Sequence, residues 1–241
     1  MNSDHLSDWL KFINSNRPNE GDFGLERLED IYSQIVQSPL AKKTILVGGT
    51  NGKGSTIEFL KNFLLSAGYK VGTYTSPHLL EFNERIKIND KSIKDNRIIR
   101  SFERIDSLKK KTRLTYFDYA TLAAFDIFSE EELDFAVLEI GIGGKYDPVN
   151  LINSDLSIIT NIELDHEKWL GSSLEEIGDQ KAAILKEGKL AILGSDEMPT
   201  SVTTKATKIC SSHYQLNKDF FIQENKSHWS YSFSEKNCNL D

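Results

Sequence analysis

Residues 44–60 read TILVGGTNGKGSTIEFL, and this stretch decides the fold. The run TILVGG, Thr44 to Gly49, is rich in β-branched residues and ends in glycine, which predicts a buried strand. From Ser55 onward apolar residues recur at helical spacing as far as Gly68, a residue suited to ending a helix. The stretch therefore predicts a strand, a glycine-rich turn and a helix in direct succession.

The turn itself, GGTNGKGST from Gly48 to Thr56, has the composition of a phosphate-binding loop. Glycines let backbone N–H groups turn toward phosphate oxygens, the helix N-terminus adds positive potential, and Lys53 can reach the terminal phosphates. The match to G-x-x-x-x-G-K-[ST] is imperfect, because Gly54 stands where a hydroxyl is expected and Ser55 follows one place later. The alternative is a glycine-rich turn with a surface lysine. The agreement of strand, loop and helix favours a nucleotide site.

The rest of the chain alternates short β-rich runs with helical patterns. Strands are predicted over 71–76, 134–141, 155–162 and 190–193, helices over 99–108 and 117–133, and a loop or short hairpin over 83–96. Strands that are apolar on both faces and separated by helices predict an α/β fold, a mostly parallel sheet with helices on both faces. Residues 218–241 alternate in polarity, which predicts a small antiparallel β segment near the C-terminus.

Composition and charge exclude several classes of function. The chain has 241 residues, 29 Lys+Arg against 36 Asp+Glu and a net charge of −7, which argues against nucleic acid as the main partner. No apolar run approaches the ~18 residues needed to cross a bilayer, and the first residues lack the apolar stretch of a signal peptide. Cys210 and Cys238 make no disulfide framework. We expect a cytoplasmic monomer without a membrane partner.

Three polar residues, Ser76, Glu139 and His166, lie at or just beyond the ends of predicted strands. Ligands of open α/β sheets bind just beyond the carboxyl ends of the strands. A carboxylate in an apolar strand is costly unless it meets a cation, whereas a Ser-Pro pair or a lone histidine often has only a structural role. Together the three side chains predict a magnesium–nucleotide site. Asp147, in the glycine-rich loop after Glu139, fits a turn residue equally well.

Lys181 lies on the apolar stripe of another predicted helix. Ser172 and Glu175 form an S-x-x-E capping box that opens this helix. Its apolar stripe has steps of 3, 4 and 3 residues, through Leu174, Ile177, Lys181 and Ile184. The ammonium group either extends past the edge of the core or is partly buried with a lowered pKa, which would make it reactive.

Taken together, these stretches resemble the bacterial dihydrofolate synthase/folylpolyglutamate synthase family of the Mur-ligase superfamily. The resemblance is carried by DFGLERL from Asp22, GGTNGKGST from Gly48, YKVGTYTSPHLLEFNERI from Tyr69, LTYFDYATLAAF from Leu114, LEIGIGGKYDPVN from Leu138, and ITNIELDHEKWLGSSLEEIGDQKAAILKEGKLAILG from Ile159. These motifs occur in the family's order and extend to about Pro199. The resemblance implies a phosphate-loop core like the central domain of Mur ligases.

The resemblance also implies an activity and a set of site residues. The activity is ATP-dependent addition of L-glutamate to dihydropteroate or to folates through an acyl phosphate, with ATP and two Mg²⁺ ions. The ATP phosphates would be held by Thr50, Asn51, Gly52, Lys53, Gly54 and Ser55. Mg²⁺ would be held by Ser76, Glu139, His166 and, once carbamylated, Lys181, with Lys53, Lys181 and His166 as catalytic residues. The pterin would contact Gly21, Asp22, Phe23, Thr115, Tyr146, Asp147 and Pro148.

The resemblance further implies a division of the chain into three parts. These are a helical lead-in with a substrate-contacting loop over 1–40, a phosphate-loop α/β core over 41–195 and an incomplete β-rich extension over 196–241, with the C-terminal ligase domain absent. Lys145 replaces the family's arginine, which loses the planar fork of a guanidinium. Two alternatives stay open, a nucleotide-binding remnant without ligase chemistry and another Mur-type amide ligase.

Overall fold

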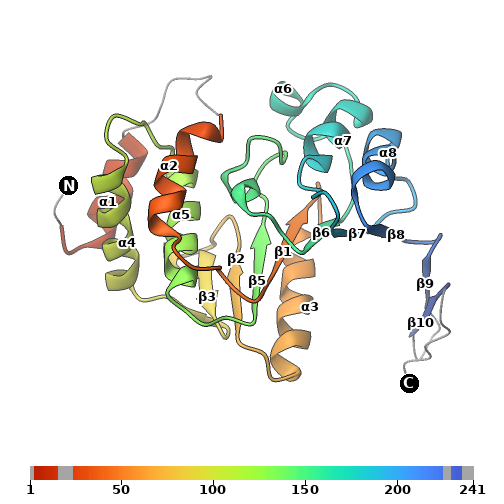
Figure 1. Ribbon diagram of the computed structural model, residues 1–241, viewed down its shortest axis with the longest axis horizontal. Coiled ribbons are helices and arrows are strands. Elements are labelled where there is room, and N and C mark those ends of the chain that lie inside the picture. Colours follow the sequence, from red (N-terminus) through yellow and green to blue (C-terminus); the bar gives the residue numbers. More distant parts are fainter. Residues whose placement is uncertain (1–2, 16–23, 225–228, 235–241) are drawn as a thin grey trace.

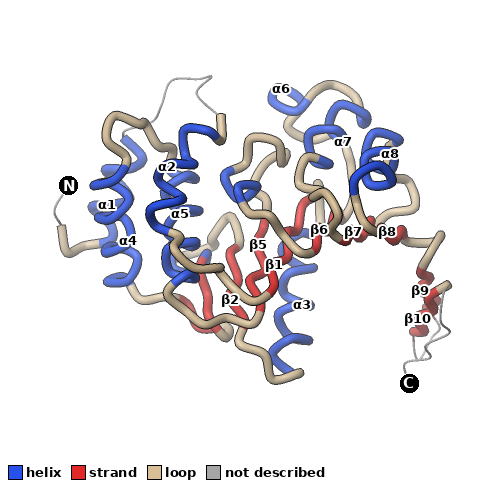
Figure 2. Tube along the Cα trace, viewed as in Figure 1, coloured by secondary structure: helices blue, strands red, loops and turns tan. Residues whose placement is uncertain are grey.

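A central eight-stranded sheet organises the computed structural model, which describes residues 3–15, 24–224 and 229–234 (Figures 1 and 2). The strand order is β4-β3-β2-β5-β1-β6-β7-β8. The strands are β1 (Lys43–Gly48), β2 (Val71–Tyr74), β3 (Ile86–Ile88), β4 (Lys91–Ser92), β5 (Phe135–Glu139), β6 (Leu156–Ile159), β7 (Leu190–Leu193) and β8 (Ser212–Gln215). Neighbouring strands from β2 across to β8 run parallel, and β3 and β4 add an antiparallel edge.

Helices cover both faces of this sheet, as Figure 1 shows. The α-helices are α1 (Leu6–Ser15), α2 (Glu26–Ile35), α3 (Lys53–Ser66), α4 (Asp95–Leu108), α5 (Tyr116–Ser129), α6 (Glu167–Leu170), α7 (Leu174–Ala182) and α8 (Thr200–Ile209), and the 3-10 helices are η1 (Phe82–Arg85) and η2 (Pro148–Leu151). α1, α2, α4, α5, α7 and α8 share the larger apolar core on one face. On the opposite face Ile57 of α3 packs into a smaller core with Val47 and Val137.

The position of β1 in the middle of the sheet explains its sequence. β1 pairs with β5 on one side and with β6 on the other, so its side chains are buried alternately in the two cores. A strand covered on both faces reads as a continuous apolar run rather than as an alternation. The predicted α/β fold with a mostly parallel sheet is therefore confirmed, as is the small antiparallel segment, formed by β9 (Phe220–Glu224) and β10 (Trp229–Phe233).

The segment expected to be only β-rich, 196–241, also contains α8 and the parallel strand β8. The helix buries two residues, Val202 and Ala206, among threonines and lysines. An apolar stripe this narrow gives little helical periodicity in the sequence. The helix is stabilised instead by its packing against α7. No helix within the described ranges is long and apolar enough to cross a bilayer.

The capping box of α7 lies one residue later than the sequence pattern suggested. Ser173 Oγ accepts a hydrogen bond from Glu176 N at 3.3 Å, and the Glu176 carboxylate accepts from Ser173 N at 3.1 Å. Glu175, expected in this box, instead accepts from Thr200 N at 2.9 Å and from Ser201 N at 2.7 Å, at the start of α8. The S-x-x-E pattern fits both registers, and the contact with α8 decides between them.

Candidate active site

The turn between β1 and α3 leaves open space at the start of the helix. Gly52, at the N-cap position, has φ +79°, and no side chain of the described residues caps α3. A Cβ atom added at Gly52 or at Gly54 would meet no atom of the described residues within 4 Å. At Gly49, where φ is +136°, a Cβ would instead collide with Thr160 Oγ1. A helix start without a side-chain cap and with open space at its glycines suits an anion such as a phosphate group.

The segment after β6 fixes the shape of this turn. Asn51 N donates to Asn161 Oδ1 at 2.9 Å, and the side-chain amides of Asn51 and Asn161 donate to the Glu163 carboxylate at 3.0 and 2.9 Å. Glu163 N donates in turn to Thr50 Oγ1 at 3.0 Å. The side chains of Thr50 and Asn51 therefore hold the loop in place from its outer side.

Two lysine amines meet at one carbonyl of the loop. Lys53 Nζ donates to Gly49 O at 3.2 Å and to Thr50 O at 3.1 Å, and Lys181 Nζ donates to Gly49 O at 2.8 Å. Lys181 is only 3% exposed, so of its two expected states the structure has the buried one. Burial, together with the charge of Lys53, lowers the pKa of Lys181 to about 8, against an opposing effect of Asp165. A much larger fraction of this amine is neutral near pH 7 than in an ordinary lysine.

Ser76 and Glu139 lie side by side at the ends of β2 and β5. Ser76 N donates to Glu139 Oε2 at 2.9 Å, and Glu139 is 5% exposed. Burial raises the pKa of Glu139, while the Ser76 amide and the charges of Lys53 and Arg85 act in the opposite direction. Within the described ranges Glu139 has no ion-pair partner. A buried carboxylate without an ion-pair partner suits a hard divalent cation.

His166 stands at the start of α6 with φ +50° and a side chain that is 47% exposed. Its Nε2 atom lies 3.5 Å from Asp165 Oδ2, and among the described residues it forms no hydrogen bond or ion pair with Ser76 or Glu139. No three His, Cys, Asp or Glu side chains among the described residues gather closely enough to hold a metal ion. The expected set contains only two residues of these types, so phosphate and water oxygens would complete the coordination.

Two of the residues expected to contact a pterin have their side chains engaged within the protein. Thr115 caps α5: its Oγ1 accepts from Asp118 N at 3.0 Å, and Thr115 N donates to the Asp118 carboxylate at 2.6 Å. The buried Asp147 carboxylate accepts from Gly141 N at 2.8 Å, Ile142 N at 3.0 Å and Val149 N at 2.9 Å. Both side chains shape the loops around the site.

The neighbouring Tyr146 and Pro148 complete the described part of this expected set. Tyr146 is 53% exposed, with Lys145 Nζ 5.4 Å from its ring centroid, and Pro148 begins η2. The Lys145 ammonium thus makes a cation–π contact with the ring of the next residue. Gly21, Asp22 and Phe23 lie outside the described residues.

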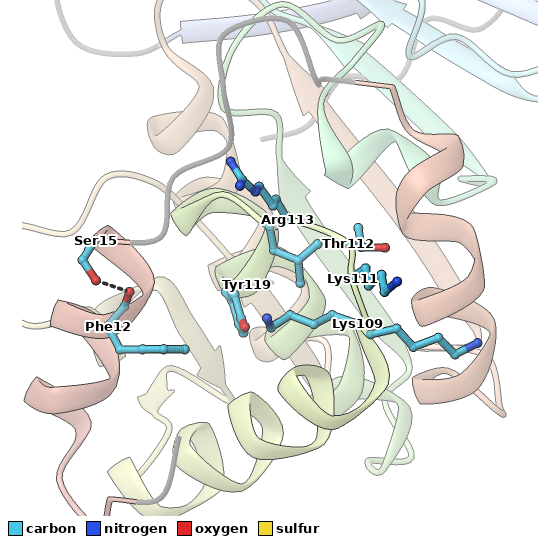
Figure 3. Close-up of a pocket in the computed structure, with 9 residues that line it drawn as sticks. Phe12, Ser15, Lys109, Lys111, Thr112, Arg113 and Tyr119 are labelled. Atoms are coloured by element: carbon cyan, nitrogen blue, oxygen red, sulfur yellow. Dashed lines mark hydrogen bonds between the residues drawn. The ribbon is translucent and has the colours of Figure 1, made fainter.

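A second cavity, of about 370 Å³, lies between the end of α1 and the segment 109–114 (Figure 3). Its lining includes Phe12, Tyr119, Lys111 and Arg113. Figure 3 shows Lys111 and Arg113 extending in different directions, so their charges do not converge on one point. This cavity therefore offers no convergent anion site comparable to the phosphate loop.

Residues 47–239 match the Mur ligase middle domain. The chain belongs to the Mur ligase family. It is 36% identical over 230 residues to the dihydrofolate synthase/folylpolyglutamate synthase of Escherichia coli, covering 95% of this chain and 52% of that protein. It is 43% identical over 194 residues to the protein of the same name from Buchnera aphidicola, covering 80% and 46%. This Mur ligase chain spans about half the length of the curated relatives it matches.

Solved structures agree with this assignment. E. coli FolC in complex with DHPP and ADP superposes on the Mur ligase chain with a TM-score of 0.91 at 34% identity, covering 98% of this chain and 57% of that one. A bifunctional folylpolyglutamate synthase/dihydrofolate synthase with Mn, AMPPNP and L-glutamate bound gives 0.88 at 34% identity, covering 98% and 56%. The resemblance drawn from the sequence motifs is confirmed.

Sequence reasoning placed Glu163 at a strand end without giving it a role, and it missed Arg85 at this candidate site. Glu163 anchors the loop amides, and its position directly after a predicted strand was the available signal. Arg85 is 8% exposed, and its Nε donates to His78 Nδ1 at 2.8 Å. It belongs to a polar segment, 83–96, whose composition gave no sign that one cation in it is buried.

Proposed function

We propose that this chain is the nucleotide- and magnesium-binding part of a ligase that joins L-glutamate to dihydropteroate and to folates at the expense of ATP. The observation that carries the proposal is the open helix start at Gly52 and Gly54 beside the buried pair Ser76 and Glu139. Val47, one residue before the glycine pair of the loop, is the register partner of Glu139, so the two features are neighbours in the sheet. The names of the relatives and the ligands in the solved structures support the folate assignment.

The proposed reaction has two steps. A carboxylate oxygen of the substrate bonds to the γ-phosphorus of ATP while the bond to the β,γ-bridging oxygen breaks, which gives an acyl phosphate and ADP. The α-amine of L-glutamate then attacks the acyl carbon, and the tetrahedral intermediate expels inorganic phosphate and loses a proton to leave an amide. Lys53, with Thr50, Asn51, Gly52, Gly54 and Ser55, would bind the phosphates, and its charge would offset the charge that develops on them.

Ser76, Glu139 and His166 would hold Mg²⁺, which supplies charge neutralisation at the phosphate oxygens when bound. The donor set fits, because Glu139 is buried without a cation among the described residues. Lys181 would supply a ligand for a second ion after carbamylation, in which the neutral amine bonds to the carbon of CO₂ and loses a proton. This step replaces a positive charge by a negative one, and the lowered pKa of Lys181 favours it.

We propose that the substrate lies against the loops that Thr115 and Asp147 shape. Tyr146 offers an exposed ring to a flat heterocycle, and Pro148 follows it; Gly21, Asp22 and Phe23 would complete the contact. In this proposal the lead-in 1–40 and the core 41–195 both face the pterin, and β8, within 196–241, extends the sheet beyond β7.

Phosphate release from ATP in the presence of dihydropteroate and L-glutamate tests the proposal, measured for the wild-type chain and for Lys53→Ala. We expect release that depends on both substrates and is lost in the variant. Binding of ATP without turnover would favour a nucleotide-binding module instead. If ATP fails to bind at all, or if turnover persists in Lys53→Ala, the proposal is wrong.

A further inference from the structure

Arg85 is a buried arginine with no ion-pair partner among the described residues. It ends η1 and is 8% exposed, and no carboxylate of the described residues lies within ion-pair distance of its guanidinium group. The adjacent Glu84 is engaged elsewhere, since its carboxylate accepts from the backbone N–H groups of Leu79 and Leu80, each at 2.8 Å, and from that of Glu81 at 2.6 Å. A buried charge without a counter-charge is costly, so its presence calls for an explanation.

The groups that do contact Arg85 are uncharged. Its Nε donates to His78 Nδ1 at 2.8 Å, which requires that nitrogen to be unprotonated. The guanidinium carbon lies 5.8 Å from the ring centroid of Phe82 and 5.5 Å from that of Tyr116. These contacts orient the planar group, but they stabilise its positive charge far less than a carboxylate would. The positive charge is therefore held in a fixed position and left available to an anion.

Its position is between the two halves of the proposed site. Arg85 O accepts from Thr75 N at 2.9 Å, which ties it to the residue before Ser76. Tyr116, on its other side, directly follows Thr115 at the start of α5. The charge of Arg85 also acts on Glu139 at the end of β5. Arg85 thus lies near both the residues proposed for the metal and those proposed for the pterin.

We infer that Arg85 binds the carboxylate of the aromatic acid substrate, the group that attacks ATP. The inference rests on the proposed function and deepens it. The forked guanidinium matches a carboxylate in geometry as well as in charge, so it would both hold the acid and aim one of its oxygens. Binding would also give the buried cation an ion-pair partner, which the described residues do not provide.

A matched pair of ligands tests this assignment. One is dihydropteroate and the other is the same compound without its carboxyl group, and the dissociation constants are measured by calorimetry on the whole chain. We expect the wild type to prefer the carboxylate compound by about tenfold or more, the range of a charged hydrogen-bonded pair. Arg85→Met should remove that preference, and Arg85→Lys, which keeps the charge and loses the fork, should retain only part of it.

Arg100→Met is the control, because Arg100 is an exposed arginine on α4 that pairs with Glu130. Its preference should match that of the wild type. If Arg85→Met does not fold, a reduced preference in Arg85→Lys supports the assignment, and an unchanged one overturns it. An unchanged preference in a folded Arg85→Met overturns it as well, and leaves Arg85 a structural role through His78 and the two rings. If the wild type binds neither compound, the proposed function fails first, and the role of Arg85 fails with it.

Discussion

Lys181 Nζ lies 2.8 Å from Gly49 O, so a buried amine on α7 is hydrogen-bonded to the glycine that begins the phosphate loop. The same carbonyl accepts from Lys53 Nζ at 3.2 Å. Burial lowers the pKa of Lys181 to about 8, and the repulsion between the two cations on one carbonyl adds to this effect. A charged amine buried in this place lowers the free energy of unfolding, and this cost can be measured by unfolding a variant without the amine.

Lys181→Met should stabilise the chain near neutral pH. A pKa lowered from 10.5 to about 8 corresponds to about 3 kcal/mol at a pH below both values. Loss of the hydrogen bond to Gly49 O would offset about 1–2 kcal/mol of this. Urea unfolding in CO₂-free buffer at pH 7 should therefore show a free energy of unfolding higher by about 1–2 kcal/mol. An equal or lower value in the variant would contradict the assigned cost.

The stability of the wild type should also depend on alkaline pH. Because the pKa of Lys181 is lower in the folded state, the unfolded state binds more protons between about pH 8 and 10.5, and the free energy of unfolding rises with pH in that range. Lys186, whose pKa burial also lowers to about 8, contributes in the same direction. Lys181→Met should reduce the slope without abolishing it. An identical slope in both proteins would contradict this account.

Gly54→Ala should separate stability from nucleotide binding. Gly54 lies in the first turn of α3, where alanine is favoured by up to about 0.5–1 kcal/mol, and the added Cβ meets no atom of the described residues within 4 Å. The methyl group would occupy space that we assign to phosphate. We expect a higher melting temperature and an ATP affinity reduced by tenfold or more; unchanged affinity would place the phosphates elsewhere.

Gly49→Ala provides the matched contrast to Gly54→Ala. Its φ is +136°, and a Cβ would collide with Thr160 Oγ1 while approaching Thr160 N. We expect the variant to lose about 2 kcal/mol of stability or more in urea unfolding. A variant as stable as the wild type would show that the loop and β6 are not packed as described.

Asn161→Ala should weaken nucleotide binding through the loop. Asn161 Oδ1 accepts from Asn51 N at 2.9 Å, and without it the loop amide loses its partner. We expect the dissociation constant for ATP to rise by about tenfold, with about 1 kcal/mol of stability lost. Lys42→Ala, which removes an exposed lysine at the opposite end of β1, serves as the control. Equal affinities in the two variants would rule out the anchoring role.

The elements with strong periodicity could be predicted from the sequence, and the contacts between distant segments could not. β1, the loop and α3 follow from a β-branched run, glycines and a helical apolar stripe. α8 was missed because it buries only Val202 and Ala206. The capping register of α7 depends on Glu175 reaching α8, a contact that a local pattern does not encode.

The same limit applies to the site. Ser76 and Glu139 were predicted to lie together because parallel strands end at one edge of the sheet, and their backbone-to-carboxylate contact of 2.9 Å agrees with that expectation. The burial of Arg85 depends on Phe82 and Tyr116 closing over it from two elements. From the local sequence alone, such a residue cannot be distinguished from a solvated surface arginine.

The most direct test of the central claim is the affinity of a non-hydrolysable ATP analogue with and without Mn²⁺, measured for the wild type and for Glu139→Gln. The account predicts that Mn²⁺ tightens nucleotide binding by the wild type by tenfold or more, and that Glu139→Gln abolishes this gain while leaving the metal-free affinity unchanged. A wild type that binds the analogue equally well with and without the metal, or a Glu139→Gln chain that keeps the full gain, would contradict it.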